Sequence, residues 1–397
     1  MGQKGSPRVL AGDVDSSSLT ALNRICPYFT MFPLRVPYGI MRRHGRSGQR
    51  VLDPFCGRGT TIYAARLLGL EGIGLDSSPV AAAVAAAKTV TATTRSIVRA
   101  YRSALESIPQ PTQVPDGGFW RLAYHPRTLQ TLCRLREALL VDCRSDSRVA
   151  LRAILLGALH GPLTKGTSSY LSNQSPRTFA PKPAYAERFW VRRNLEPRDV
   201  NVEAVVRTRA ERYFAVETTP RGGEVRLADS RRSESYRGLP DQAFDWVITS
   251  PPYYGMRTYV PDQWLRNWFV GGPDVTDYSA EHQLRHSSPT DFAAELKQVW
   301  QYAGRLSKPG ARMMVRFGGI NDRTADPVTI IKASLKESAW EVSAIRSAGL
   351  ASAGKRQAAH FGAGVDEPRA EFDVWAVRTD GQTACSGISP APALRFS

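Results

Sequence analysis

The sequence predicts an α/β protein with a mostly parallel, doubly wound sheet and an inserted, mainly helical subdomain. One supporting observation is a glycine turn, Gly57-Arg58-Gly59, placed between a strand-type run and a helical run. The other is a set of four strand-type runs that each lead to a polar side chain: Asp53, Asp76, Asp229 and Ser250. Parallel strands end at a common edge, where open α/β sheets bind ligands, so we expect these four side chains together.

The glycine turn belongs to a predicted β-α-β unit. A strand ends at Asp53, a helix spans residues 62–68, and a second strand ends at Asp76, 23 positions after Asp53. That offset is near the one at which a ribose-binding acid closes such a unit. The Gly-Lys-Ser/Thr ending of a phosphate loop and the third glycine of a dinucleotide fingerprint are both missing. The pattern therefore favours a ligand with a positive amino group and no phosphate.

The alternating α/β pattern lapses between about residues 96 and 214. Helical patterns occupy residues 126–141, 147–159 and 196–217, and a long polar loop spans 164–183. Loops of that length are usually functional or disordered, and this one mixes basic, amide and aromatic side chains. We expect it to contact nucleic acid, with a solvated linker as the alternative. Its candidate contacts are Asn173, Arg177, Lys182, Arg192 and Arg193.

Sheet-type runs return after the helical segment. Strands are expected at 225–230, 244–248, 312–317, 341–347 and 372–378, with helices at 38–43, 79–88, 289–306 and 327–338. The predicted organisation has a flexible amino terminus (1–20) and the first part of the core (21–95). The helical insertion (96–214), the second part of the core (215–380) and a flexible tail (381–397) follow.

A second motif, Ser250-Pro251-Pro252-Tyr253, follows the strand at 244–248. Two successive prolines make a stiff, extended corner that has no backbone donors. Such a corner presents a hydroxyl, a bare carbonyl and an aromatic ring in a fixed arrangement. These groups suit a planar ligand with an amine, which needs two acceptors and a face to stack on. The alternative is an ordinary proline-terminated strand.

Charge and cysteine content narrow the class of protein. The chain has 53 Lys and Arg against 36 Asp and Glu, a formal charge of +17, which favours a polyanionic partner and nucleic acid first. An anionic membrane surface is the alternative, but no apolar run has transmembrane length. Five scattered cysteines are expected to be reduced thiols in the cytoplasm. His282 and His286 form no zinc pattern and are expected at the surface.

The two motifs resemble those of the amino-group DNA methyltransferases, which use S-adenosylmethionine to methylate the exocyclic amine of cytosine or adenine. Asp53–Thr61 is similar to their cofactor motif and Ser250–Tyr253 to their catalytic motif, of SPPY type. The resemblance covers roughly residues 25–95 and 220–380. It implies a Rossmann-like class I methyltransferase sheet, S-adenosylhomocysteine as product and no metal. The implied cofactor contacts are Phe32, Pro33, Asp53, Pro54, Phe55, Gly57, Gly59, Thr60, Thr61, Asp76, Ser77, Asp229 and Ser230.

The resemblance also implies a mechanism for the catalytic residues Ser250, Pro251, Pro252 and Tyr253. The Ser250 hydroxyl and the Pro251 carbonyl would accept hydrogen bonds from the target amine, and Tyr253 would stack on a base flipped out of the duplex. Serine at the first position is more usual for cytosine N4 than for adenine N6. Adenine, an RNA amine and a non-catalytic binding protein stay open as alternatives. Cytosine-carbon methylation is excluded, because the chain has no Pro-Cys dipeptide.

The resemblance implies DNA as the partner and allows a cognate restriction or defence component as a second one. It also implies a cytoplasmic, nucleoid-associated location of prokaryotic type. The cofactor motif precedes the catalytic motif, which differs from the commonest order in relatives with this cofactor motif and leaves the recognition region open. The insertion 96–214 is the first candidate and the loop after the catalytic motif is the second. Further DNA contacts are expected from Tyr254, Arg257, Lys355 and Arg356.

Overall fold

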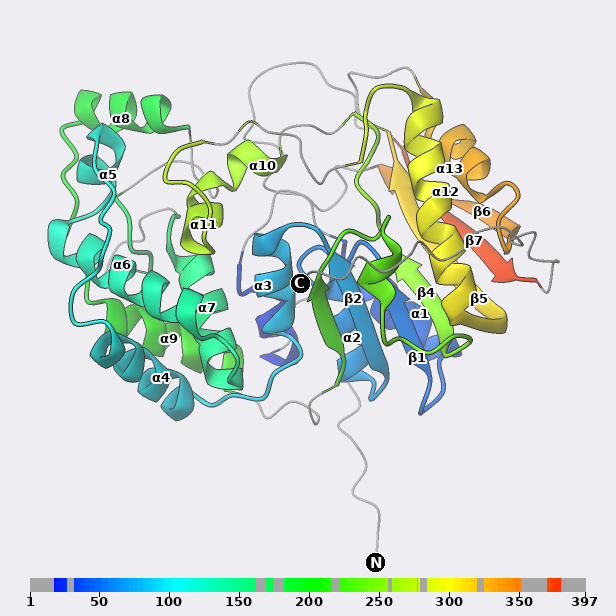
Figure 1. Cartoon of the computed structure of the whole chain (residues 1–397), viewed down its shortest axis with the longest axis horizontal. Helices are drawn as coiled ribbons and strands as arrows, with labels where there is room; N and C mark the ends of the chain where they lie inside the picture. Colours follow the sequence, from blue (N-terminus) through cyan, green and yellow to red (C-terminus); the bar gives the residue numbers. More distant parts are fainter. Residues whose placement is uncertain are drawn as a thin grey trace, which may run out of the picture.

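The computed structural model describes residues 18–26, 32–161, 169–173, 182–215, 222–255, 259–276, 278, 284–319, 325–350 and 370–379. Within them, seven strands form one sheet in the order β3-β2-β1-β4-β5-β7-β6 (Figure 1). β7 runs antiparallel to β5 and β6, and the other neighbours pair in parallel. The strands are β1 (Arg50–Asp53), β2 (Glu71–Asp76), β3 (Glu224–Leu227), β4 (Phe244–Thr249), β5 (Ser307–Gly318), β6 (Trp340–Leu350) and β7 (Ala370–Arg378).

Helices cover both faces of the sheet. The first part of the chain contributes α1 (Arg35–His44), α2 (Thr60–Leu67) and α3 (Pro79–Ala86), and a short 3-10 helix, η1 (Ser18–Arg24). After β3 come η2 (Ser233–Tyr236), α10 (Tyr259–Asp262), α11 (Trp264–Phe269), α12 (Pro289–Leu306) and α13 (Pro327–Leu335). Buried side chains of α1 to α3 share one core cluster, and those of α12 and α13 share another. The predicted doubly wound α/β architecture is therefore confirmed.

Several helices begin where the sequence supplies a cap followed by proline. Ser78 accepts a hydrogen bond from the Ala81 N–H, and Ser288 accepts one from the Asp291 N–H. Asp326 accepts from both Val328 and Thr329. Proline occupies the first helical position in each case, where it costs no internal hydrogen bond. These local signals explain why the helices that connect the strands start where they do.

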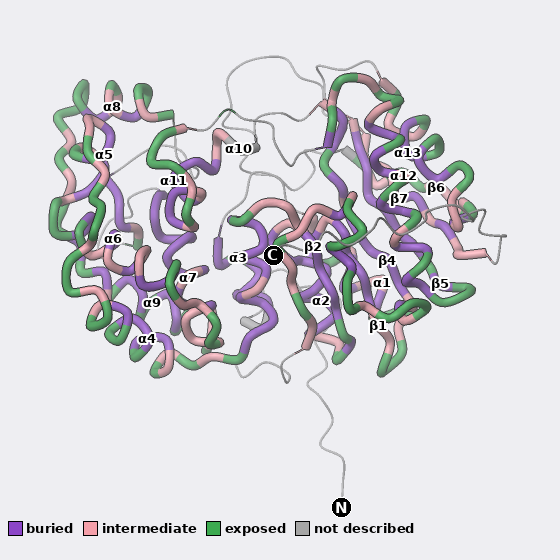
Figure 2. The backbone as a smooth tube through the Cα atoms, in the orientation of Figure 1, coloured by how far each residue is buried: buried purple, intermediate pink, exposed green. Residues whose placement is uncertain are grey.

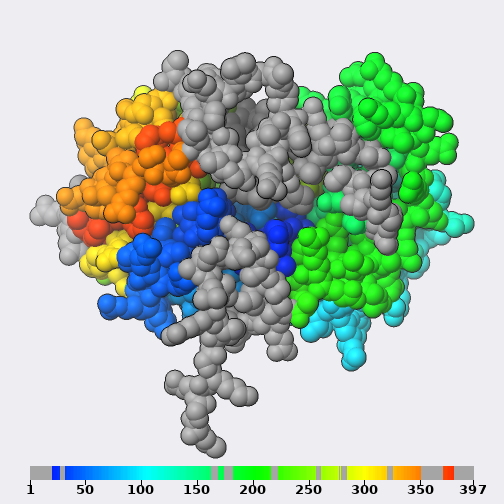
Figure 3. Space-filling model, turned by 180° about the vertical axis from the view of Figure 1, so that it is seen from behind, coloured from blue at the N-terminus to red at the C-terminus, as the bar shows by residue number. Residues whose placement is uncertain are grey.

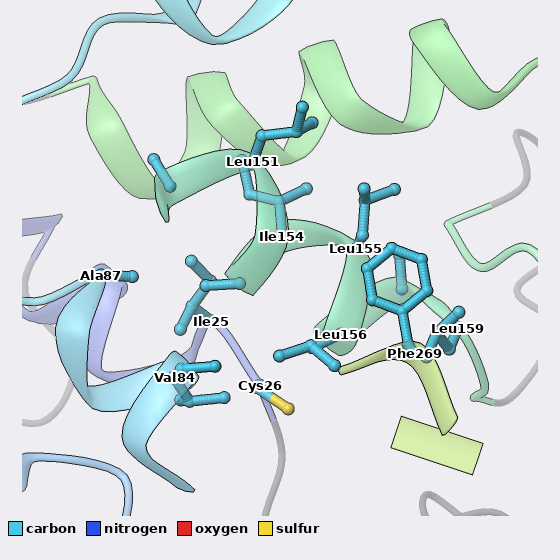
Figure 4. Close-up of a cluster of buried hydrophobic side chains, with 14 of the residues drawn as sticks. Ile25, Cys26, Val84, Ala87, Leu151, Ile154, Leu155, Leu156, Leu159 and Phe269 are labelled. Carbon is cyan, nitrogen blue, oxygen red and sulfur yellow. The ribbon is translucent and has the colours of Figure 1, made fainter. Parts of the chain in front are cut away.

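The segment between β2 and β3 is helical, and it packs against the sheet domain. It contains α4 (Thr94–Ser107), α5 (Gly118–Ala123), α6 (Pro126–Val141), α7 (Asp146–Ala158), α8 (Pro183–Arg192) and α9 (Val202–Phe214). In Figure 2 the buried (purple) parts of the tube lie within this helical group and along the strands, while its outer turns are exposed. Figure 4 shows Leu155 and Leu156 of α7 in one cluster with Val84 of α3 and Phe269 of α11. This segment and the first β-α-β unit therefore share a core.

The structure differs from the sequence-based prediction in a few elements. The helix expected at 196–217 begins at Val202, and α4, α5 and α8 were not predicted. α8 begins at Pro183, where the loop expected at 164–183 ends, and only two of its side chains, Ala186 and Trp190, are buried, which leaves little helical pattern in its sequence. The third strand was expected to reach residue 230 but ends at Leu227.

On the face of the sheet seen from behind, α1 is the one described helix that lies against β5, β6 and β7. Figure 3 shows the blue region that contains α1 beside the orange and red strands β6 and β7, which reach the surface there. α12 and α13 lie on the opposite face of the same strands (Figure 1). One face of β5, β6 and β7 therefore lies against α12 and α13, while the other lies beside α1 and reaches the surface.

Gly59 is required at the start of α2 for two independent reasons. Its φ is +75°, a left-handed conformation that penalises any side chain. A Cβ there would also lie 2.8 Å from the Ala85 Cβ on α3. Gly48 has a similar φ of +80° but open space around its Cβ position. A comparison of substitutions at the two glycines therefore separates the cost of backbone strain from the cost of steric overlap.

We predict that Gly59→Ala lowers the free energy of unfolding by more than about 2 kcal/mol, since strain and overpacking add. The control, Gly48→Ala, should cost only about 1 kcal/mol from its positive φ. Urea titrations of both variants measure the difference. Equal losses would show that Ala85 moves aside and that the α2–α3 contact is loose.

Candidate functional site

The carboxyl ends of β1, β2 and β4 meet at one edge of the sheet. Asp53 pairs in register with Gly74 on β2, and Asp76 pairs with Leu227 on β3. β4 ends at Thr249, directly before Ser250. The Ala228 N–H donates to the Asp76 carbonyl over 2.9 Å, which keeps the residues after β3 at the same edge. The predicted gathering of the four polar residues at one edge is confirmed, while their functional roles stay predictions.

Asp53 is almost fully buried and joins β1 to β4. Its Oδ1 accepts a hydrogen bond of 2.6 Å from the Thr249 hydroxyl and one of 3.2 Å from the Phe55 N–H. Only 2% of the residue is exposed. Burial raises the pKa of Asp53 to about 7, although these hydrogen bonds oppose the shift. Asp53 was expected to face a ligand, and the structure gives it a linking role between the two predicted motifs.

Asp76 closes the glycine turn from the end of β2. Its Oδ2 accepts from the Gly57 N–H and its Oδ1 from the Ser78 N–H, both over 2.9 Å. Burial raises the pKa of Asp76 to about 6, and the two hydrogen bonds oppose that shift. The residue is partly exposed at the sheet edge, so its carboxylate can accept further hydrogen bonds from hydroxyl groups.

The residues around the turn fit a ligand with amino and hydroxyl groups. Gly57 has a φ of +51°, and a Cβ there would meet no atom within 4 Å, so the backbone faces open space. The Thr60 hydroxyl is buried and has no hydrogen-bond partner among the described residues. α2 also starts without a side-chain cap. Open backbone, an unpaired hydroxyl and the Asp76 carboxylate can form hydrogen bonds with the amino and hydroxyl groups that S-adenosylmethionine carries.

The remaining predicted cofactor residues are buried or partly buried. Thr61 is buried, and the Phe55 ring lies edge-on to Trp300, with centroids 6.0 Å apart. The Phe32 ring lies 5.8 Å from the Arg316 guanidinium carbon. Partly buried members of the set are Pro33 and Ser77, and Pro54 is buried.

Asp229 was expected to contact the cofactor, but its carboxylate is engaged by Arg231. The Arg231 Nη2 lies 2.6 Å from Asp229 Oδ2, and its Nη1 lies 3.0 Å from Glu295 Oε2. Burial acts to raise the pKa of Asp229, but the Arg231 hydrogen bonds and charge hold it below its ordinary value. Ser230 is buried beside it. Arg231, two positions away, therefore already occupies part of this carboxylate, and the cofactor contact of Asp229 stays a prediction.

The residues of the Ser250-Pro251-Pro252-Tyr253 corner differ in how far they are exposed. Ser250 is partly exposed, Pro251 is buried and Pro252 is exposed. The Tyr253 hydroxyl donates to Glu371 Oε1 on β7 over 2.7 Å, and its ring lies edge-on to Phe317. Burial, and then the Glu371 charge, raise the pKa of Tyr253 well above its ordinary value, so the hydroxyl stays a donor. The sequence did not predict Glu371, which lies 118 positions from Tyr253.

Tyr254 was predicted to contact DNA, but it is buried. Its ring packs against Phe292 and His286, with centroids 5.5 and 6.0 Å away. His286 is partly buried, and its Nδ1 accepts a 2.8 Å hydrogen bond from the Gly255 N–H. The expectation of a surface histidine was therefore wrong for His286, which anchors the end of the catalytic corner. His282 lies outside the described residues.

The other predicted DNA contacts divide into three groups. Asn173 is 6% exposed and donates to the Leu122 and Leu195 carbonyls, so it ties α5 to the chain after α8 and was wrongly assigned to a surface. Three basic residues are exposed near α8: Lys182, Arg192 and Arg193. The residues outside the described part of the chain are Arg177, Arg257, Lys355 and Arg356.

Comparison with known proteins bears on the part of the chain that holds the glycine turn. Residues 12–87 match a family model described as DNA methylase (N6_N4_Mtase). No curated protein matches the chain. The match agrees with the predicted amino-methyltransferase family and does not distinguish N4 from N6 as the target.

Similar solved structures include the rRNA methyltransferase AviRa from Streptomyces viridochromogenes, at 15% identity over 91% of this chain and 92% of that one, TM-score 0.35. A methyltransferase from Methanosarcina mazei shares 10% identity over 88% and 99%, TM-score 0.32. Magnesium protoporphyrin IX methyltransferase from Synechocystis PCC 6803 shares 10% over 92% and 93%, TM-score 0.32. Scores this low say nothing about the substrate.

The strand order, with β7 reversed between β5 and β6, is that of the Rossmann-like class I methyltransferase sheet, so the predicted fold class is confirmed. This sheet and the family match support a methyltransferase that depends on S-adenosylmethionine. Among the described residues no group of three or more His, Cys, Asp or Glu could hold a metal ion. None of the described helices is long and apolar enough to cross a membrane.

The raised pKa of Asp53 predicts how stability depends on pH. The folded state binds this proton up to about pH 7 and the unfolded state only to about pH 4, from the ordinary value of 3.8. The stabilisation is therefore complete below about pH 4 and is lost as pH rises through about 7. Asp53→Asn should reduce this fall, whose slope reaches at most about 1.4 kcal/mol per pH unit.

Urea titrations of wild type and Asp53→Asn between pH 4.5 and 7.5 measure this difference. Asp76 contributes a smaller fall in the same direction, and it remains in both proteins. Parallel curves would show that Asp53 is ionised throughout the range and that its burial costs less than the structure indicates.

Proposed function

We propose that this chain is an S-adenosylmethionine-dependent DNA methyltransferase that methylates the N4 amine of a cytosine flipped out of the duplex. The observation that carries the proposal is the position of the Ser250-Pro251-Pro252-Tyr253 corner at the end of β4, next to the glycine turn at the end of β1. The DNA methylase match of residues 12–87 and the +17 charge agree with it. The choice of cytosine rests on the resemblance in which serine precedes Pro-Pro-Tyr.

The cofactor would be held by the turn and the acidic strand ends. Gly57, Gly59 and Thr60 offer close backbone approach and a hydroxyl, and Asp76 offers acceptors for ribose hydroxyls. When bound, S-adenosylmethionine supplies an electrophilic methyl group. Asp229 can take part only if it shares its carboxylate with Arg231.

The corner would convert a poor nucleophile into a better one. The lone pair of an exocyclic amine is delocalised into the base ring. Hydrogen bonds from both N–H groups, to the Ser250 hydroxyl and the Pro251 carbonyl, would localise that pair and stabilise positive charge on the nitrogen as it develops. Transfer would be direct, without a covalent enzyme intermediate. The proton would leave the nitrogen after the methyl group is attached.

Tyr253 would provide a face for the flipped base, and Glu371 would fix the angle of its ring. The hydrogen bond of 2.7 Å to Glu371 and the edge contact with Phe317 restrain the ring from two directions. A carbon side chain at Gly318 would lie 3.0 Å from the Tyr253 ring, so this glycine makes the position accessible. Glu371 is therefore a positioning residue, which acts through Tyr253.

We predict that Glu371→Ala lowers kcat for DNA methylation about tenfold, because a hydrogen bond to a charged group that orients Tyr253 is lost. Glu371→Gln keeps an acceptor oxygen and should retain most of kcat. Cofactor affinity should stay within twofold in both variants. Steady-state kinetics and calorimetry provide these values. Equal losses in the two variants would mean that the carboxylate charge, and not the hydrogen bond, matters.

The direct test of the proposed function is Ser250→Ala. We expect transfer of labelled methyl groups from S-adenosylmethionine to DNA to slow about 100-fold, since one acceptor for the reacting amine is removed. Cofactor affinity by calorimetry should match wild type. Ser103→Ala, at an exposed position on α4, is the matched control and should change neither value.

Other outcomes of the same assay would contradict the proposal. Loss of both methyl transfer and cofactor affinity in Ser250→Ala would make Ser250 a structural residue. Transfer to RNA with none to DNA, by wild-type protein, would refute DNA as the substrate. Absence of cofactor binding at millimolar concentration would refute a methyltransferase of any kind.

A further inference from the structure

A groove of about 600 Å³ lies between α1 and the neighbouring face of β5, β7 and β6. It is outside the proposed catalytic corner and outside the helical insertion. Basic side chains from three of its elements line it, and we call it the arginine groove, defined by Arg42, Arg43, His44, Arg312, Arg316 and Arg346.

Strand alternation explains why one face of these strands is basic. On β5, Met313, Val315 and Phe317 are buried in the core with α12 and α13. Arg312 and Arg316 alternate with these residues and point to the opposite face. Among the described helices, only α1 covers that face. Figure 3 views this face, where the blue α1 region lies beside the orange and red strands. The groove is therefore open at the molecular surface.

The groove has far more positive than negative charge. Its five arginines face one acidic side chain, Asp373, and Arg316 uses that carboxylate in a bidentate pair of 2.7 and 2.8 Å. Arg42, Arg43 and Arg346 are exposed and make no hydrogen bond or ion pair with residues that the structure describes. Like charges at such density repel one another unless an anionic partner lies between them.

One end of the arginine groove lies on the strand next to the proposed catalytic corner. Thr249 pairs in register with Val315, so Arg316 lies level with Ser250. The Arg316 guanidinium carbon is 5.8 Å from the ring of Phe32, a predicted cofactor contact. Arg312 lies four residues back along β5, a distance of about 13 Å. A polymer bound at the corner can therefore continue along the groove.

We propose that the arginine groove binds the phosphate backbone of substrate DNA beside the base that is methylated. This inference rests on the proposed function and adds a contact surface to it. Guanidinium groups form bidentate hydrogen bonds with phosphates, and contacts of this kind fix the register of DNA without reading its sequence. The groove would position the strand, while base recognition would lie elsewhere.

The test compares two double variants that each remove two positive charges. Arg42→Gln/Arg346→Gln changes one residue on each wall of the groove. The matched control, Lys332→Gln/Lys336→Gln, changes two exposed lysines on and just after α13, on the opposite face of the sheet. Binding of a labelled 20-base-pair duplex of mixed sequence is measured by anisotropy from 50 to 200 mM salt, with S-adenosylhomocysteine present.

We expect the groove variant to bind DNA at least tenfold more weakly at 0.1 M salt, and its slope of log K against log salt to fall by about 1.8. The control should match wild type in both. In the methylation assay the groove variant should show a raised KM for DNA with kcat unchanged. Calorimetric cofactor affinity equal to wild type would show that the fold is intact.

Two results would overturn the inference. If the groove variant keeps the wild-type salt slope while wild type methylates DNA, the groove does not bind DNA and the proposed function stands. If the slope falls only with an RNA duplex of equal length, the occupant is RNA. Failure of wild type to methylate DNA would instead count against the proposed function, so the two claims fail separately.

Discussion

The hydrogen bond between the Thr249 hydroxyl and the buried Asp53 carboxylate is the constraint on which the candidate site depends. It joins the ends of two adjacent parallel strands that are separated by 196 positions in the chain. Hydrogen bonds also join the opposite ends of β1 and β4. The Asp245 carboxylate accepts from the Arg50 N–H, and the Trp246 indole donates to the Gln49 side chain. β1 and β4 are thereby held in register, so the glycine turn and the proline corner follow neighbouring strands at the same edge of the sheet.

This arrangement explains how a large helical segment can interrupt the chain without disturbing the site. α4 to α9 leave and return between β2 and β3, on one side of the β1–β4 pair. The segment is stabilised against α3, which follows β2, and against α11, which follows the proline corner, through a shared apolar core. The catalytic half gains its rigidity from the antiparallel pairing of β7 with β5, which brings Glu371 to Tyr253.

Local sequence patterns predicted the strands, the glycine turn and the shared edge, because each depends on short-range alternation and on Gly and Pro geometry. Side-chain partners from distant segments could not be predicted in the same way. The ion pair between Arg231 and Asp229 differs from these, because the two residues are only two positions apart and the Asp-Ser-Arg-Arg sequence is a local hint of it. Tyr254, Asn173 and His286 look like surface residues in a polar context. Their contacts come from elsewhere in the chain: Tyr254 packs against Phe292 of α12, Asn173 donates to Leu122 of α5, and His286 accepts from the Gly255 N–H.

The most direct test of the central claim is long-read sequencing of plasmid DNA from a methylation-free host that expresses this protein, read for modified bases. The account predicts N4-methylcytosine at one short recurring motif, and its absence when the host expresses Ser250→Ala. N6-methyladenine at such a motif would contradict the choice of base while keeping the reaction. Unmodified DNA from a host that contains well-folded wild-type protein would contradict DNA methylation as the function of this chain.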